Sequence, residues 1–125
     1  MIVLDASALL AFLFRERGHG QVADVLDDCC MSTVNLSEVI GRFVRDGHSA
    51  SVVLQRLLGT PIEFVSFTED QAALTAQLIP STRALGLSFG DRACLALAMA
   101  RGLQAMTADQ AWEALNVGVA VHVIR

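Results

Sequence analysis

Short apolar runs alternate along this chain with segments whose hydrophobic residues recur at helical spacing. The runs have the length of strands and lie at residues 2–4, 62–67, 104–106 and 119–124. Helices are predicted between them over residues 6–14 and 53–58, and over residues 93–100, which are apolar on every side as in a buried central helix. Apolar strands that are separated by helices predict a parallel sheet covered on both faces. We therefore expect an α/β fold with three layers, α/β/α, and a short central parallel sheet.

Further helices are expected on either side of the middle strand. Apolar residues at i, i+3, i+4 and i+7 predict one helix over residues 22–29 and another that begins near Asn35. Thr68 and Gln71 have the spacing of a capping box, which predicts that a helix begins there. Gly102 follows the most apolar helix and is expected to end it as a C-cap.

Length and composition fit a single domain over residues 1–125. A chain of 125 residues that is 54% hydrophobic buries roughly two thirds of its unfolded surface in one core. No apolar run approaches the roughly 20 residues that span a bilayer, and the first residues lack the features of a signal peptide. We expect a soluble cytoplasmic protein with no membrane contact. Cys29, Cys30 and Cys94 lack zinc-ligand spacing and are expected to be buried and reduced.

The charge balance limits how this chain can meet nucleic acid. Its net charge is -4, and its nine basic residues are all arginine. This balance argues against a broad basic surface for nucleic acid, whereas a few local phosphate contacts stay compatible with it.

Four acidic residues stand at the ends of strands or near the starts of helices. Asp5 follows the first strand, and Asp109 follows the strand that ends at Met106. Both belong to the rim at which open α/β sheets bind ligands. Glu38 lies one turn into an expected helix, and Asp91 opens the most apolar one. If these helix starts meet the same rim, four carboxylates share one cleft.

Each of these acids also has a simpler interpretation as a helix cap. Acidic side chains in a first turn accept hydrogen bonds from free N–H groups and complement the helix dipole, which contributes about 0.3–1 kcal/mol. Asp5 and Asp91 fit such positions, and Asn35 and Glu38 have N-cap to N3 spacing. Glu38 also stands four residues before Arg42, the spacing of an ion pair on a helix. Taken singly, capping explains each acid at least as well as a shared site.

The joint interpretation is favoured by the cost of gathering like charges. Two like charges 4 Å apart repel by about 1 kcal/mol in water and about 4 kcal/mol at an effective dielectric of 20. Only arginine or a metal can compensate them, because the chain has no lysine. Oxygen ligands suit Mg²⁺ or Mn²⁺, and these ions support phosphodiester hydrolysis.

Four segments together resemble the PIN-domain nucleases, and among them the VapC-type toxins of bacterial toxin–antitoxin modules. The segments are IVLDASALL, VNLSEV, LSFGDRACLALA and AMTADQAW. They follow the family's order over nearly the whole chain. Each fragment alone is weak, whereas the set is specific.

The resemblance implies an endoribonuclease that hydrolyses RNA phosphodiester bonds. By this resemblance Asp5, Glu38, Asp91 and Asp109 bind one or two Mg²⁺ or Mn²⁺ ions. The supporting positions are Ser7 and Thr107, which match hydroxyls that hold acids or waters, and Asn35. Spacing alone explains Ser7 and Thr107 equally well as local helix caps, and it explains Asn35 better as a cap. It also implies a homodimer inhibited by a small VapB-like antitoxin. A basic antitoxin segment would complement this acidic chain.

The remaining conspicuous residues have weaker claims to a function. Arg42 and Arg45 share a polar stripe with Glu38 and are candidates to contact RNA phosphate, although a solvated helix face explains them better. Arg92 follows Asp91 and is a candidate for the same role or for an ion pair. The three histidines form no ligand or triad pattern. Trp112 lies in an expected helix and is assigned to the core rather than to base stacking.

Three other classes of protein are compatible with parts of the pattern. Phosphoryl-accepting receiver domains and haloacid-dehalogenase-like phosphatases place acids at strand ends, but both use a lysine, which this chain lacks. A catalytically silent PIN-fold module that binds an antitoxin-like partner is the strongest alternative. The complete set of four acids counts against it.

Overall fold

A central sheet of five parallel strands organises the molecule. The computed structural model describes all 125 residues. The strands are β1 (Ile2–Leu4), β2 (Cys29–Ser32), β3 (Glu63–Val65), β4 (Gln104–Thr107) and β5 (Val121–Val123). Their order across the sheet is β3-β2-β1-β4-β5, and every pairing is parallel. The predicted α/β class is therefore confirmed.

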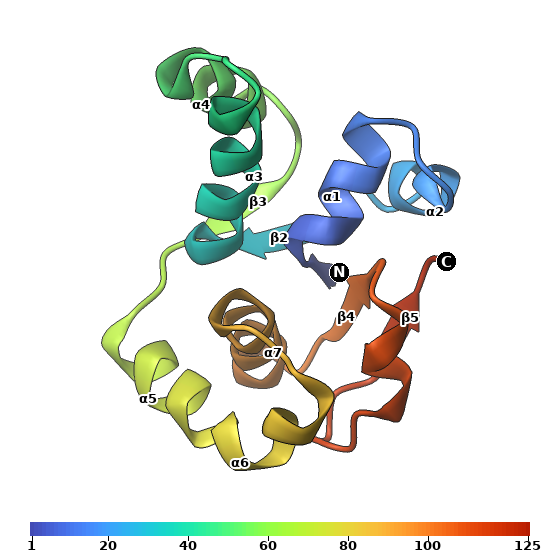
Figure 1. Cartoon of the computed structure of the whole chain (residues 1–125), viewed down its shortest axis with the longest axis vertical. Coiled ribbons are helices and arrows are strands. Elements are labelled where there is room, and N and C mark those ends of the chain that lie inside the picture. Colours follow the sequence, from blue (N-terminus) through green and yellow to red (C-terminus); the bar gives the residue numbers. More distant parts are fainter.

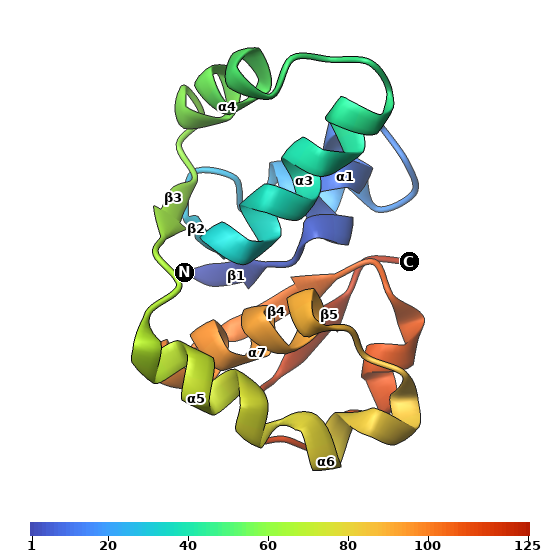
Figure 2. The ribbon, with the colours of Figure 1, turned by 60° about the vertical axis from the view of Figure 1, so that its left-hand side comes forward.

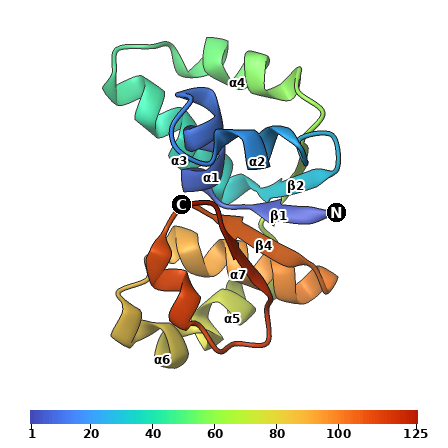
Figure 3. The same cartoon turned by 90° about the vertical axis from the view of Figure 1, so that its right-hand side faces the viewer.

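Helices cover both faces of this sheet, as Figures 1 and 2 show. One face carries α1 (Ala6–Leu13), α2 (His19–Ala23), α3 (Thr33–Arg45) and α4 (Ala50–Leu58). The other carries α5 (Glu69–Gln77), α6 (Ile79–Thr82), a 3-10 turn η1 (Arg83–Leu85) and α7 (Phe89–Arg101). A second 3-10 helix, η2 (Gln110–Ala114), joins β4 to β5. Figure 3 shows the two helical layers edge-on, with the C-terminus beside β1.

Alternate side chains of the strands pack into two separate hydrophobic cores, one on each face of the sheet. Leu4 and Met31 belong to the core under α1 and α3, whereas Val3 and Ala105 belong to the core under α7. The segment 93–98 of α7 is completely buried, as expected for a helix that is apolar on every side. None of the helices combines the length and the apolar character that a membrane span requires.

The strand order places a topological switch point beside the first strand. The chain starts in the middle of the sheet at β1, adds β2 and β3 on one side, and then crosses to β4 and β5 on the other. Leu4 pairs with Met106, so Asp5 stands level with Thr107 where β1 and β4 end. Ligands of open α/β sheets bind at such a point.

Two local predictions were wrong, and both concern the start of β2 and α3. The helix predicted over residues 22–29 ends at Ala23, and Cys29 begins the completely buried strand β2. Periodicity alone cannot separate a short buried strand from a helix face, and here the pairing of β2 with β1 on one side and β3 on the other decides. Asn35 is not a helix cap, because α3 begins at Thr33 behind Ser32.

Several sequence predictions about helix ends and buried residues are confirmed. Gly102 ends α7 in the left-handed conformation, with φ of 64°. The Thr68 side chain accepts a hydrogen bond of 3.2 Å from the backbone N–H of Gln71 at the start of α5. The three cysteines are free and buried. Trp112 is completely buried, although its segment forms a 3-10 rather than an α-helix.

The end of β5 is fixed by contacts with β4, with α2 and with the glycine before α2. The backbone N–H of Ile124 donates to the Thr107 carbonyl at 2.9 Å, and Gln21 Nε2 donates to the Ile124 carbonyl at 3.3 Å. Gly18 has φ of 92°, and a Cβ at this position would overlap the Ile124 carbonyl oxygen. Glycine is therefore required here for conformation and for space.

Replacing Gly18 by alanine should destabilise the fold, whereas the same change at Gly20 should not. Gly18→Ala combines a left-handed backbone with a steric overlap at Ile124, so we expect the free energy of unfolding to fall by about 2 kcal/mol. A Cβ on Gly20 meets no atom within 4 Å, so Gly20→Ala is the matched control. Urea denaturation measures both. Equal stability of the two variants would contradict the close approach of Gly18 to Ile124.

Candidate active site

The four predicted acids line one pocket at the carboxyl ends of the strands. The pocket has a volume of about 470 Å³, and Arg45 also lines it. Its acidic residues are Asp5, Glu38, Asp91 and Asp109. They come from the ends of β1 and β4 and from the first two turns of α3 and α7. Residues separated by up to about a hundred positions thus meet at the switch point.

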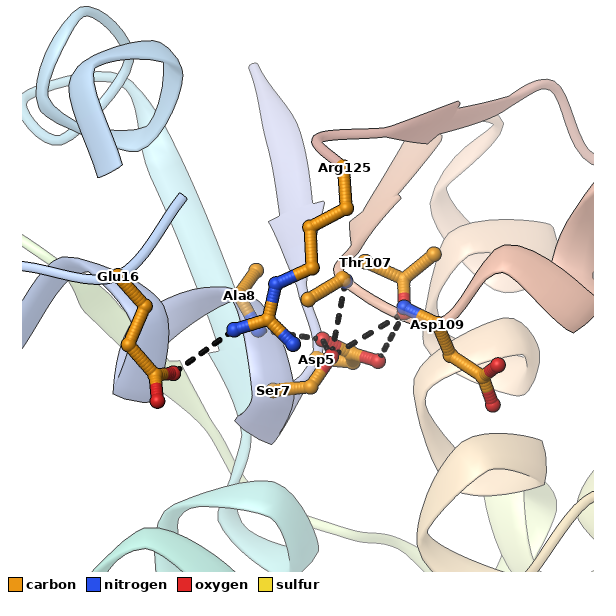
Figure 4. A network of polar contacts seen from close by, with 8 residues as sticks. Asp5, Ser7, Ala8, Glu16, Thr107, Asp109 and Arg125 are labelled. Carbon is orange, nitrogen blue, oxygen red and sulfur yellow. Dashed lines mark hydrogen bonds and ion pairs between the residues drawn. The ribbon is translucent and has the colours of Figure 1, made fainter. Parts of the chain in front are cut away.

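Asp5 is buried and fully engaged by hydrogen bonds. Its Oδ1 accepts from the backbone N–H of Ala8 at 2.8 Å, which caps α1, and from Ser7 Oγ at 2.8 Å. Its Oδ2 accepts from Thr107 Oγ1 at 2.6 Å (Figure 4). The side chain therefore has both predicted roles, as a helix cap and as a member of the acidic pocket.

Two hydroxyl groups tie the end of β1 to the end of β4. Ser7 Oγ accepts from the backbone N–H of Ala108 at 2.9 Å, and Thr107 Oγ1 accepts from the backbone N–H of Asp109 at 3.0 Å. Both hydroxyl protons already point to Asp5, so the 3.2 Å approach of Ser7 Oγ to Thr107 Oγ1 is a contact between acceptors. The hydroxyls thus fix the position of the Asp5 carboxylate from two sides.

Burial and neighbouring charge raise the pKa of two of these carboxyl groups. Burial raises the pKa of Asp5 from 3.8 to about 6, against the lowering effect of the Thr107, Ala8 and Ser7 hydrogen bonds. Burial also raises the pKa of Glu38, and its bond from Asn35 opposes this. The charge of Asp91 raises the pKa of both carboxyls. A cation in the pocket would relieve this accumulated charge.

Asn35 holds Glu38 against the start of α7. Its Nδ2 donates to Glu38 Oε1 at 2.8 Å and to the Gly90 carbonyl at 2.9 Å. A Cβ on Gly90 would overlap the Glu38 carboxylate, so the side chain packs directly on the glycine backbone. Asn35 is itself buried, and its Oδ1 has no hydrogen-bond partner. This amide therefore links two helices and positions one acid, instead of capping α3.

Asp91 and Asp109 each cap a helix with one oxygen and leave the other free. Asp91 Oδ2 accepts from the backbone N–H of Ser88 at 2.8 Å in a capping box. Asp109 Oδ1 accepts from the backbone N–H of Ala111 at 3.0 Å. The second oxygen of each carboxylate has no hydrogen bond within the protein, so capping and ligand binding are compatible in the same residue.

The donor set of the pocket fits a hydrated divalent cation. No three acidic, histidine or cysteine side chains lie close enough together to hold one ion directly. Mg²⁺ keeps several waters and uses one or two carboxylates, and oxygen ligands also suit Mn²⁺. The pocket offers oxygens and a raised carboxyl pKa at Asp5 and Glu38. An ion bridged partly by water suits this arrangement better than a tight cage of four carboxylates.

The structure separates the three arginines that the sequence suggested as phosphate contacts. Arg45 lines the acidic pocket. Arg42 does not; its Nε pairs with Asp46 Oδ2 at 3.3 Å, and its guanidinium lies 4.8 Å from the Phe14 ring centroid. The ion pair suggested between Arg42 and Glu38 is therefore replaced by one with Asp46. Arg92 Nε donates to the Ser88 carbonyl at 3.4 Å and lies outside the pocket lining.

Sequence reasoning missed two residues at this rim, Gly90 and Arg125. The signal for Gly90 is its place directly before Asp91, where the close approach of Glu38 excludes any side chain. Arg125 lines a second pocket together with Ser7 and Asp109. Its signal is its position just beyond the last strand, because parallel strands all end at the same rim.

The chain matches one protein family over almost its whole length. The family model described as PIN domain matches residues 2–117. A comparison with curated protein sequences gives no match.

Similar solved structures come from several bacteria. A toxin–antitoxin complex from Klebsiella pneumoniae has a TM-score of 0.76 at 16% identity, with 100% of this chain and 98% of that chain covered. FitAcB from Neisseria gonorrhoeae has a TM-score of 0.71 at 22% identity, with 97% of this chain and 96% of that chain covered. Mycobacterium tuberculosis VapC20, described as a sarcin–ricin loop cleaving toxin, has a TM-score of 0.71 at 20% identity. The match covers 96% of this chain and 99% of that chain. At these identities the likeness shows the fold.

The raised pKa of Asp5 predicts a pH-dependent contribution to stability in metal-free buffer. The folded chain binds the Asp5 proton more tightly than the unfolded chain does, so the stability contributed by this proton is fully present below about pH 4 and is lost as pH rises through about 6. The loss is at most about 3 kcal/mol. We expect Asp5→Asn in EDTA to remove this component and to be more stable than the wild type at pH 7.5 by about 2 kcal/mol.

Urea denaturation at pH 4.5 and pH 7.5 measures this difference. Asp109→Asn is the matched control, because it removes an exposed carboxylate from the same pocket. If the wild type and Asp5→Asn lose stability equally between the two pH values, the assignment of a raised pKa to Asp5 is wrong.

Adding a methyl group at Gly90 should displace Glu38 and weaken binding of a divalent cation. We expect Gly90→Ala to lower the affinity for Mn²⁺ about tenfold, as loss of support for a ligand typically does. Gly41→Ala is the control, because Gly41 lines the same pocket and a Cβ there meets no atom within 4 Å. Electron paramagnetic resonance of free Mn²⁺ measures both. Equal affinities would show that the position of Glu38 is unimportant for the ion.

Proposed function

This chain belongs to the PIN-domain family, and from that premise we propose that it is a Mg²⁺- or Mn²⁺-dependent endoribonuclease that acts as the toxin of a VapBC-like toxin–antitoxin module. One observation carries the proposal, namely the convergence of four carboxylates on one pocket at the switch point. Helix capping explains each acid singly. It does not explain why all four line the same pocket, where their charges repel.

The four carboxylates divide into two that are fixed and two that are partly free. Asp5 is held by two hydroxyls, and Glu38 is held by Asn35. Asp91 and Asp109 each keep one oxygen without a protein partner. We assign the ion to these four residues, through direct and water-mediated contacts. When bound, Mg²⁺ or Mn²⁺ neutralises phosphate charge and makes a water more acidic.

The protein's own contribution to hydrolysis is to orient the reacting groups. The free oxygens of Asp91 and Asp109 can accept hydrogen bonds from the attacking water and direct its lone pair at phosphorus. The hydroxyls of Ser7 and Thr107 prevent the Asp5 carboxylate from turning away. Arg45, at the edge of the pocket, can neutralise a phosphate that approaches the acids.

RNA is the proposed substrate, on the strength of family and neighbours together. The similar M. tuberculosis structure is described as a toxin that cleaves the sarcin–ricin loop. The net charge of -4 and the absence of lysine mean that this chain holds RNA through the cation and a few arginines. Binding to the backbone should accordingly be weak when the divalent cation is removed.

The proposed partners are a VapB-like antitoxin and a second copy of this chain. The similar structure from K. pneumoniae is described as a toxin–antitoxin complex. An acidic pocket complements a basic antitoxin segment, which would block the site by occupying the place of the cation and the substrate. The alternative is a PIN-fold module that binds such a partner without cleaving RNA.

Cleavage of RNA separates the enzyme from the silent module. We expect single-stranded RNA to be cleaved in Mg²⁺ and to survive in excess EDTA. Asp91→Asn should lower the rate about 100-fold or more, because it removes a group that acts on the reacting atoms. Asp70→Asn, in the first turn of α5 and exposed, should retain activity. Gel analysis of labelled RNA measures the rates.

The same variants distinguish the outcomes in cells. Induced wild-type protein should stop growth, and Asp91→Asn should not, provided that circular dichroism shows the variant to be folded. Equal cleavage with and without EDTA would contradict the metal-dependent mechanism. Tight binding of an antitoxin without any cleavage would establish the silent module.

A further inference from the structure

A second pocket adjoins the acidic one. It has a volume of about 580 Å³ and is lined by Ser7, Ala108, Asp109, Gln110 and Arg125. Ser7 and Asp109 line both pockets, so the two hollows meet at these side chains. The second pocket is therefore placed beside the proposed reaction centre, on the side of β5.

The register of the sheet places Arg125 at this position. Thr107 of β4 pairs with Val123 of β5. Two residues beyond this pair, past the end of each strand, Asp109 and Arg125 line the same pocket. The sheet thus brings one acid and one arginine side by side at the carboxyl ends of neighbouring strands.

The backbone before Arg125 is held from both sides. Ile124 is buried, donates to the Thr107 carbonyl and accepts from Gln21 Nε2. Gly18 packs closely on the carbonyl of Ile124. The base of the Arg125 side chain is consequently fixed by the sheet, by α2 and by the glycine before α2.

The ion pair of Arg125 orients its guanidinium and occupies only one of its nitrogens. Its Nη2 donates to Glu16 Oε1 at 2.8 Å, with both side chains partly exposed. An exposed pair of this kind contributes little to stability. The remaining nitrogens have no hydrogen bond within the protein and stay available to an anion. Figure 4 shows the guanidinium between Glu16 and the cluster formed by Asp5, Ser7 and Thr107.

We propose that this second pocket binds an RNA backbone phosphate next to the scissile one, and that Arg125 is the residue that binds it. The inference rests on the proposed ribonuclease function. A strand crossing the rim needs positive charge beside the four carboxylates, because these repel its phosphates. Among the arginines, Arg45 lines the acidic pocket and Arg125 lines the second one. Arginine suits the role because its planar fork matches phosphate oxygens.

Binding of RNA by slowly cleaving protein tests the assignment. Every protein compared carries Asp91→Asn to limit cleavage, and the probe is a fluorescein-labelled single strand of roughly 12 nucleotides, whose dissociation constant is measured by anisotropy in Mg²⁺ at several salt concentrations. We expect Arg125→Gln to weaken binding roughly fivefold and to reduce the slope of log K against log salt by about 0.7, the contribution of one phosphate contact. Arg125→Lys should keep the slope, because it keeps the charge.

Arg83→Gln is the matched control. It removes one exposed arginine from η1, which lies in the other helical layer and outside both pockets. If Arg125→Gln and Arg83→Gln weaken binding equally, general charge is responsible and the phosphate site is wrong. If the wild type neither binds nor cleaves RNA, the ribonuclease proposal fails and the subsite fails with it.

A neutral linkage locates the phosphate. Once the cleavage position is mapped, substrates carry a methylphosphonate at the linkage on one side or the other of the scissile bond. One of these substrates should be cleaved with the same KM by the wild type and Arg125→Gln. The other should retain the difference in KM. If neither substitution abolishes the difference, Arg125 does not bind an adjacent phosphate.

Discussion

Burial of a carboxylate at the point where β1 and β4 end is the constraint on which the site depends. Asp5 is 2% exposed, and burial raises its pKa to about 6. Hydroxyls of Ser7 and Thr107 and a backbone N–H of α1 surround it with donors. These donors also connect the β1–α1 turn to the β4–η2 turn. One charged group thereby fixes the geometry of the two loops that carry the rest of the rim.

Two of the four acids are held in place by donors, and the other two keep one carboxylate oxygen free. The two carboxylates with a raised pKa, Asp5 and Glu38, have their positions set by hydroxyl or amide donors. Asp91 and Asp109 cap helices with one oxygen and present the other to the pocket. Capping and chemistry are thus shared within a single side chain. This sharing explains why helix caps and a metal centre are hard to distinguish from spacing alone.

Much of this arrangement follows from the sequence, and the exceptions have physical causes. Strand ends and helix starts located the acids, because a parallel sheet brings all its carboxyl ends to one rim. The strand β2 was missed, since its four buried residues carry no period and depend on pairing with β1 and β3. The orientation of Asn35 and the place of Arg125 depend on contacts between segments far apart in sequence. The pattern of residues within one short segment of sequence cannot predict such contacts.

The span of chain that builds the rim has a consequence during synthesis. Asp5 receives its hydrogen bond from Thr107, which is 102 residues later. A ribosome that has made only β1, β2 and β3 has therefore produced a chain whose first acid lacks its partner and whose third and fourth acids are still absent. The pocket closes only when the β4 segment has emerged and inserted beside β1. For a protein proposed to cleave RNA, the last parts of the proposed centre are therefore among the last parts of the chain to be made.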